Sequence, residues 1–293
     1  MKDDDFYPFT GSLSGEMGAR LGYDIDMSRD GQTIVAGAPG ENGFGKVRYM
    51  IAPKAGWMKV DPESIGKEIE LGYLGIGSPQ TGDEFGAAVA ISQDDSTIVV
   101  GAPGRVVSQG SVYLFNKPSG GWLNTESLVH LKVEGLNVGD RFGESVAVSK
   151  DGSVIAVGAP GLVGQSSGNI YVFTDVDPKT SSYKVHKLGS KYVVSNAGIS
   201  IAISADGKTI VAGSYLDSKD ERKNLGSVLV YKSKSGKWTD SINDGNLAYK
   251  EINAETTGSL LGFSVDVTDD GSKVLVGIPN YNNGQGDFMW MDI

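Results

Sequence analysis

Acidic side chains supply most of the residues in this sequence that could do chemistry. The chain has 293 residues, with 36 Asp and Glu, 2 His and no Cys. Asp24 and Asp26 stand two residues apart, Asp266 occupies an equivalent place near the other end of the chain, and Glu144 is a more distant fourth. Paired carboxylates can serve as general acid and as nucleophile or base in glycoside hydrolysis, and several carboxylates together can hold a cation.

Other catalytic patterns in the sequence are weak. The two histidines, His130 and His186, fall in predicted outer strands, where we expect solvated residues. Residues 164–168 (GQSSG) match Gly-x-Ser-x-Gly, but a nucleophile elbow needs a strand-to-helix turn and a partner histidine. Without cysteine, thiol catalysis and disulfides are excluded.

An internal repeat in the sequence predicts the strands and turns that position these carboxylates. The stretch FGESVAVSKDGSVIAVGAP, residues 142–160, recurs along the whole chain, and an aspartate stands eight residues after the anchor glycine, Gly143 in this stretch, of each copy. The five anchor glycines are Gly22, Gly86, Gly143, Gly198 and Gly262, and the five aspartates are Asp30, Asp94, Asp151, Asp206 and Asp270. Repetition at about this period is typical of propellers and solenoids.

Short apolar runs between these markers predict strands. SVAVS, VIAVG and NIYVF are bounded by Gly, Pro, Asp and Ser, and their consecutive apolar residues indicate sheets covered on both faces. A more polar fourth strand follows each third strand, as suits an outer edge. We therefore expect one domain over residues 1–293, an all-β, five-bladed β-propeller of four-stranded antiparallel blades.

The two ends of the chain are expected to complete one blade together. The fifth repeat stops after its third strand, 286–293 (GDFMWMDI), and residues 6–13 form an unpartnered segment before the first anchor. The N-terminal strand is predicted to complete the last blade and close the ring. Closure makes blades one and five neighbours, so Asp24, Asp26 and Asp266 converge near the axis.

The repeats resemble a known family. FGAAVAIS…IVVGAPG and FGESVAVS…IAVGAPG resemble FG-GAP repeats, the blade repeats of integrin α-subunit propellers and of many bacterial and algal surface proteins. The resemblance covers essentially the whole chain and is closest to the shorter microbial variety. It implies a propeller that serves adhesion, ligand capture or scaffolding, since a fold does not fix a function.

The loops after the first strands depart from the calcium loops that the resemblance implies. Integrin-type propellers usually have seven blades, and several of their loops carry three or more carboxylates. The loops in this chain carry one or two, whereas calcium takes six to eight oxygen ligands. Asp-Gly favours a tight hairpin, so we expect turns here and no resident cofactor. A single cation near Asp24, Asp26 and Asp266 is an alternative to inter-blade hydrogen bonding or exposure to channel water.

Two further features could bind a ligand. The loop between the second and third strands of repeat four is the longest of its kind and is highly charged, and Lys232, Lys234 and Lys237 add basic charge that suits an anionic partner. Its candidate binding residues are Tyr215, Asp217, Lys219, Asp220, Glu221, Arg222 and Lys223. Aromatic residues also recur before the fourth strands, as sugar platforms or, preferably, as packing residues: Trp57, Trp122, Trp238 and Tyr183.

Net charge and hydropathy limit the classes of partner that we expect for this protein. The net charge of -10 disfavours nucleic acid, and no stretch approaches the ~18 apolar residues of a membrane span, so we expect no membrane insertion. The preferred function is a non-enzymatic binding or scaffold module for a protein or glycan partner, extracellular or at a cell surface. The alternative is a carbohydrate-active hydrolase that uses the axial carboxylates.

Overall fold

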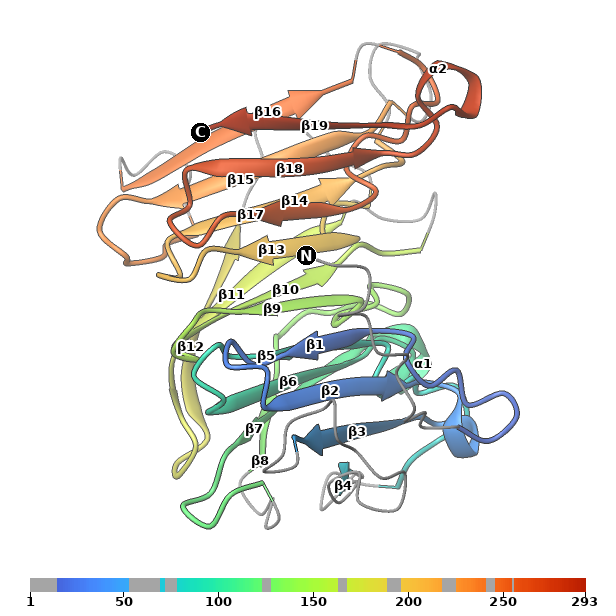
Figure 1. Ribbon diagram of the computed structural model, residues 1–293, viewed down its shortest axis with the longest axis vertical. Coiled ribbons are helices and arrows are strands. Elements are labelled where there is room, and N and C mark those ends of the chain that lie inside the picture. The colour runs from blue at the N-terminus through green and yellow to red at the C-terminus, as the bar shows by residue number, and fades with distance from the viewer. Residues whose placement is uncertain are drawn as a thin grey trace, which may run out of the picture.

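The protein is an all-β chain of five antiparallel sheets with three or four strands each (Figure 1). It is described by a computed structural model. The structure describes residues 15–52, 69–71, 78–122, 128–162, 168–188, 196–217, 225–240, 246–254 and 256–293.

Within each sheet, the strands pair in the order of the sequence. Sheet one contains β1 (Ile25–Met27), β2 (Thr33–Ala38), β3 (Lys46–Ile51) and β4 (Ile69–Leu71). Sheet two contains β5 (Ala88–Ile91), β6 (Thr97–Ala102), β7 (Ser111–Asn116) and β8 (Leu128–Leu131), and sheet three contains β9 (Ser145–Val148), β10 (Val154–Ala159), β11 (Asn169–Asp177) and β12 (Ser182–Leu188). Sheet four contains β13 (Ser200–Ile203), β14 (Thr209–Ser214), β15 (Ser227–Ser233) and β16 (Leu247–Asn253), and sheet five contains β17 (Val265–Val267), β18 (Lys273–Ile278) and β19 (Asp287–Asp292). Single helical turns occur at η2 (Glu41–Gly43), α1 (Arg105–Ser108) and α2 (Tyr281–Gly284).

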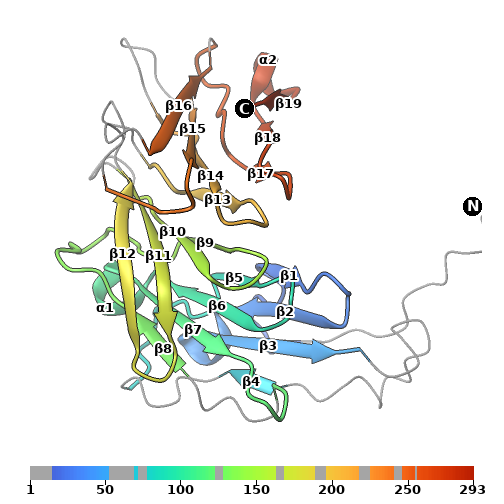
Figure 2. The same cartoon turned by 90° about the vertical axis from the view of Figure 1, so that its left-hand side faces the viewer.

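The five sheets follow one another along an arc. Figure 2 shows sheet one and sheet five at the two ends of this arc, with sheets two, three and four between them. The first strand of each sheet contacts the first strand of the next, from β1 through β5, β9 and β13 to β17. The arrangement is propeller-like, and the first strands form its inner side.

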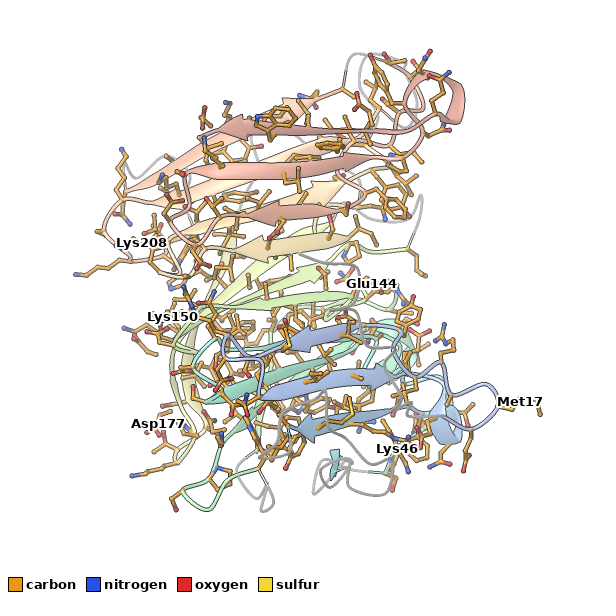
Figure 3. All side chains as sticks on the ribbon, viewed as in Figure 1. Met17, Lys46, Glu144, Lys150, Asp177 and Lys208 are labelled. Carbon is orange, nitrogen blue, oxygen red and sulfur yellow. The ribbon has the colours of Figure 1, made fainter. Side chains whose placement is uncertain are left out.

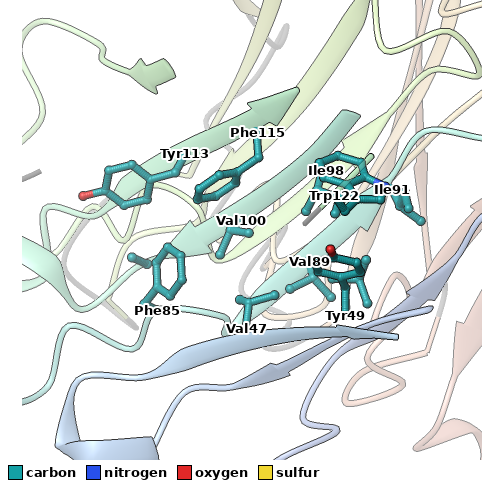
Figure 4. Packing of buried hydrophobic residues seen from close by; sticks show 12 residues of the cluster. Val47, Tyr49, Phe85, Val89, Ile91, Ile98, Val100, Tyr113, Phe115 and Trp122 are labelled. Atoms are coloured by element: carbon teal, nitrogen blue, oxygen red, sulfur yellow. The ribbon is translucent and has the colours of Figure 1, made fainter. Parts of the chain in front are cut away.

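Apolar side chains fill the junctions between consecutive sheets. Between sheets one and two, Val47 and Tyr49 of β3 pack with Phe85, Tyr113 and other residues of sheet two (Figure 4). Similar buried clusters lie between sheets two and three, three and four, and four and five. The consecutive apolar residues of the strands are therefore explained by burial of both sheet faces.

A close approach of two glycines explains the fixed spacing within the repeat. A Cβ atom on Gly158 would lie 1.9 Å from the carbonyl oxygen of Gly198, the anchor glycine of the next sheet. The same contact recurs at Gly37 with Gly86, Gly101 with Gly143 and Gly213 with Gly262. In sheets one to four, the glycine fifteen residues after the anchor is thus required because the backbone of the next sheet lies against it.

The repeated aspartates form hairpin turns, as predicted. Asp151 Oδ1 accepts hydrogen bonds from the Ser149 hydroxyl (2.9 Å) and the Ser153 N–H (3.0 Å), and Gly152 has φ +71°. Asp30, Asp94, Asp206 and Asp270 accept equivalent bonds. In each turn, Oδ1 of the aspartate is used internally.

The predicted closing strand lies outside the described residues. Sheet five has three strands in the part of the chain that the structure describes, and residues 6–13 fall beyond that part. In the described part of the chain, an ion pair links the turns that follow β1 and β17, with 3.1 Å between Arg29 Nη1 and Asp269 Oδ2. No described helix is long and apolar enough to cross a membrane.

Candidate functional site: the axial cavity

The first strands of all five sheets line one cavity of about 820 Å³. Asp24, Asp26, Glu144 and Asp266 all contribute to its wall. In Figure 3, Glu144 and Lys150 are labelled just before and just after β9, whose residues Ser145–Val148 line the cavity. The three aspartates chosen from the sequence thus face one space.

Asp24 and Asp26 join sheet one to sheet two. Asp24 Oδ2 accepts the N–H of Val89 (2.7 Å), and Asp26 Oδ2 accepts the N–H of Ile91 (2.8 Å). The other oxygens accept N–H groups of β1 itself, from Ile25 (3.0 Å) and Met27 (2.7 Å). Both carboxylates therefore satisfy backbone donors at the inner edge of β5, where no further strand pairs.

Burial raises the pKa of both carboxyls above its ordinary value. Desolvation is the main cause for Asp24 and Asp26, and the hydrogen bonds from Val89, Ile91 and the two β1 amides oppose it. The charge of Asp24 raises the pKa of Asp26 further. The cavity wall therefore favours neutral Asp24 and Asp26 more than water does.

The other three carboxylates of the cavity, Asp269, Glu144 and Asp266, each bond to different partners. Asp269 pairs with Arg29 and accepts a bond from Gln93 Nε2 (2.9 Å), while Glu144 accepts a bond from Arg141 Nε (2.6 Å). Asp266 Oδ1 accepts the N–H of Val267 (2.8 Å), and the Asp266 side chain is exposed.

Within the described ranges, no group of three or more His, Cys, Asp or Glu side chains is placed to hold a metal ion. The alternative of a single cation near Asp24, Asp26 and Asp266 stays a prediction. The inter-blade hydrogen bonding weighed against it is present at Asp24 and Asp26, whose oxygens accept backbone N–H groups of β1 and β5.

Backbone bonds between hairpin turns tie one end of the cavity together, a feature that sequence reasoning missed. Arg29 N–H donates to Gln93 O (3.2 Å), Lys150 N–H to Ala205 O (3.0 Å) and Ala205 N–H to Asp269 O (3.0 Å). Asp94 N–H completes the series by donating to Lys150 O (3.0 Å). The only sequence signal is position, since most of these residues directly precede the repeated aspartates.

The described part of the repeat-four loop is packed into the protein. The centroid of the Tyr215 ring lies 5.2 Å from that of Phe263, which precedes β17 of sheet five, and Asp217 is buried. Tyr215 therefore packs between the segments that follow β14 and precede β17, and a binding role for Tyr215 and Asp217 stays a prediction. The other candidates, Lys219, Asp220, Glu221, Arg222 and Lys223, lie outside the described residues.

The recurring aromatic residues are packing residues, as preferred from the sequence. Trp122 and Trp238 are buried, and their indole N–H groups donate to Asp95 Oδ1 (2.9 Å) and Gly207 O (3.0 Å) in the turns of their own sheets. Tyr183 is half-buried in a groove of about 700 Å³, and Trp57 lies outside the described residues.

The histidines lie in fourth strands, as predicted, but they are not freely solvated. His130 stacks on Tyr113 at 4.7 Å between ring centroids, and burial, helped by Lys132 and Arg105, lowers its pKa to about 4. His186 is half-buried beside Asp240, with 3.4 Å between Nδ1 and Oδ1. Neither residue lines the axial cavity.

Five similar antiparallel sheets around a shared cavity define a propeller-like repeat protein. The chain contains FG-GAP repeats, which match over residues 79–115 and 130–173. It is similar to the crystal structure of TolB from Acinetobacter baumannii, with a TM-score of 0.51 and 16% identity over 92% of this chain and 52% of that chain. The chain thus spans about half the length of that protein, and at this identity the likeness concerns the fold alone. No curated protein sequence matches the chain.

Proposed function

We propose that the chain is a non-enzymatic binding module, a closed five-bladed propeller that receives a protein or glycan partner at its axial cavity. The observation that carries this proposal is the cavity of about 820 Å³, whose carboxylates mostly make structural bonds. Recognition of FG-GAP repeats supports an adhesion-like or scaffold role, extracellular or at a cell surface.

Ring closure is supported by the hairpin turns. Backbone bonds link the turns of sheets one to five in order, and the Arg29–Asp269 pair links the fifth turn back to the first. A fifth junction like the other four brings sheet five against sheet one and encloses the cavity. The predicted N-terminal strand then pairs with β19, the outer strand of sheet five.

The cavity wall suits a neutral or basic ligand. Its charged residues are Asp24, Asp26, Glu144, Asp266, Asp269 and Arg29. Five acids against one base create a negative potential, which repels anions and attracts a Lys- or Arg-bearing segment. Carboxylate oxygens also accept hydrogen bonds from the hydroxyls of a neutral sugar. A protein loop or a glycan chain that enters the cavity satisfies this requirement.

The test is a binding screen of the purified chain against protein and glycan libraries. For any hit, Ala147→Gln places a longer side chain on the cavity wall and should weaken binding at least about tenfold, whereas Val185→Gln on the outer strand β12 should not. Equal loss in both variants, or no loss in Ala147→Gln, would place the ligand elsewhere and overturn the cavity as the site.

A hydrolase is the second candidate, because the raised pKa of Asp26 is what a general acid requires. Both oxygens of Asp26 already accept backbone N–H groups, which favours a structural role. Oligosaccharide turnover that disappears in Asp26→Asn, with binding retained, would replace the binding module by the hydrolase.

A further inference from the structure

The outward face of sheet five exposes side chains at positions that are buried in sheet four. Leu275 stands thirteen residues after its anchor glycine, as Val211 does, yet Leu275 is 46% exposed and Val211 is 0% exposed. Phe288 and Trp290, which pair with Gly277 and Leu275, are 60% and 69% exposed. Their equivalents Val228 and Val230 are buried against sheet five. Sheet five therefore presents the surface that each other sheet uses to contact the next one.

Sheet one presents the matching surface. Ile25 and Met27 are 65% and 54% exposed, whereas their equivalents in sheet two, Val89 and Ile91, are each 4% exposed because sheet one covers them. The two uncovered faces therefore correspond to the two sides of one inter-sheet junction. Figure 2 shows them at the two ends of the arc.

A hollow of about 180 Å³ lies on sheet five where a junction requires one. We call it the Gly277 socket, and it is lined by Ser264, Val265, Asp266, Leu275, Gly277 and Phe288. At the other four junctions, the equivalent glycine lies against the anchor glycine of the next sheet, with 1.9–2.0 Å from a Cβ position to the carbonyl oxygen. Around Gly22, the anchor of sheet one, no atom of the described chain lies within 4 Å of a Cβ position.

Two polar groups at the socket have equivalents that bond to the next sheet. Ser264 stands two residues after its anchor, like Ser145 and Ser200, whose hydroxyls donate to Gly198 O (2.7 Å) and Gly262 O (3.0 Å). The described chain shows no such bond from Ser264.

Asp266 stands four residues after its anchor, like Asp26. In both aspartates, Oδ1 accepts the N–H of the following residue. Asp26 Oδ2 also accepts the N–H of Ile91 in the next sheet, and Met27 is the residue equivalent to Ile91 in sheet one.

We propose that the Gly277 socket is the docking site for residues 21–27 of the same chain, with Ser264 and Asp266 as its specific hydrogen-bonding groups. The Ser264 hydroxyl donates to Gly22 O, and Asp266 Oδ2 accepts the Met27 N–H, which is then shared with Asp26. This assignment rests on the ring closure proposed above and names the contacts that make it. Asp266 is accordingly a positioning residue of the junction rather than a ligand-binding residue.

The absence of cysteine makes a single-thiol experiment clean. Leu275→Cys reports on the socket, and Val185→Cys on exposed β12 is the control. We expect a thiol reagent to label Cys at position 275 at least about tenfold more slowly than Cys at position 185. In the Leu275→Cys background, Asp266→Ala should raise the labelling rate about tenfold or more. Ser264→Ala should raise it by a smaller factor, because a neutral hydrogen bond contributes less than one to a charged group.

Controls separate docking from folding. Asp292→Ala removes an exposed carboxylate of the same sheet and should leave labelling at 275 unchanged, and Asp266→Asn, which keeps one acceptor oxygen, should give an intermediate rate. Circular dichroism monitors folding, and if Asp266→Ala does not fold, Ser264→Ala and Asp266→Asn carry the test.

Each outcome has a separate meaning. If labelling at position 275 is slow and neither Ser264→Ala nor an Asp266 variant accelerates it, the ring is closed but the proposed contacts of Ser264 and Asp266 are wrong. Fast labelling of the parent thiol overturns closure and socket together, while the binding screen still decides the cavity function on its own. If labelling at position 275 is slow only at high protein concentration, and light scattering gives a doubled mass, then a second copy of the chain occupies the socket. That result would overturn docking within one chain.

Discussion

At the residue scale, two groups of aspartates in this protein have pKa values shifted in opposite directions. In the turns, hydrogen bonds hold the pKa of Asp270 at about 2, with Thr268 and Ser272 as the main donors. At the junction of sheets one and two, desolvation raises the pKa of Asp26 despite its backbone bonds. The first type stabilises the fold when charged, whereas the second is favoured when neutral.

This contrast predicts opposite pH responses of two matched variants. The Asp270 contribution is present above its unfolded pKa, about 4, and is lost as pH falls toward 2, so Asp270→Asn should be less stable than the parent at neutral pH and approach it near pH 2. Asp26→Asn should gain stability relative to the parent as pH rises above about 4, through the raised pKa of Asp26. Thermal melting from pH 2 to 7 measures both, and differences that do not change with pH would contradict the assignment.

At the element scale, junctions between sheets depend on glycine more than on any side chain that could do chemistry. The Cβ position of Gly158 lies 1.9 Å from a backbone oxygen that cannot rotate away. Apolar clusters on both sides of the contact resist any shift of the strands. The repeat is therefore a packing motif.

We expect Gly158→Ala to destabilise the fold by about 3 kcal/mol, the upper part of the usual range for overpacking, because β9, β10 and β13 must separate. Gly121→Ala is the control, since its Cβ position is open and only its positive φ costs stability, about 1 kcal/mol. Chemical denaturation measures both, and equal losses would contradict the close-contact explanation.

At the scale of the whole molecule, the ends of the chain decide whether the arc becomes a ring. The outer strand of sheet five, β19, pairs with β18 on one side, whereas the third strand of every other sheet pairs on both sides. Residues 6–13 are the segment predicted to supply the fourth strand, and the Gly277 socket is the surface proposed to receive sheet one.

Deletion of residues 1–13 should therefore lower the melting temperature by several degrees, because β19 loses its predicted partner and sheet five its connection to sheet one. Deletion of residues 1–5 (MKDDD), which precede the predicted strand, is the control and should have little effect. An unchanged melting temperature after the longer deletion would contradict closure by the N-terminal strand.

The sequence by itself determined the local and periodic features of this protein. Asp-Gly turns, short apolar strands and the glycine fifteen residues after each anchor depend on neighbouring residues and on a contact repeated at every junction, so five copies were enough to predict five sheets. The tertiary structure decided what depends on single, non-repeated contacts. Asp24 and Asp26 turn toward β5 because its inner amides pair with no further strand, and Tyr215 packs against Phe263 at a junction while Asp217 is buried. The periodic pattern averages over such contacts, which is why the orientation of each carboxylate could not be predicted from it.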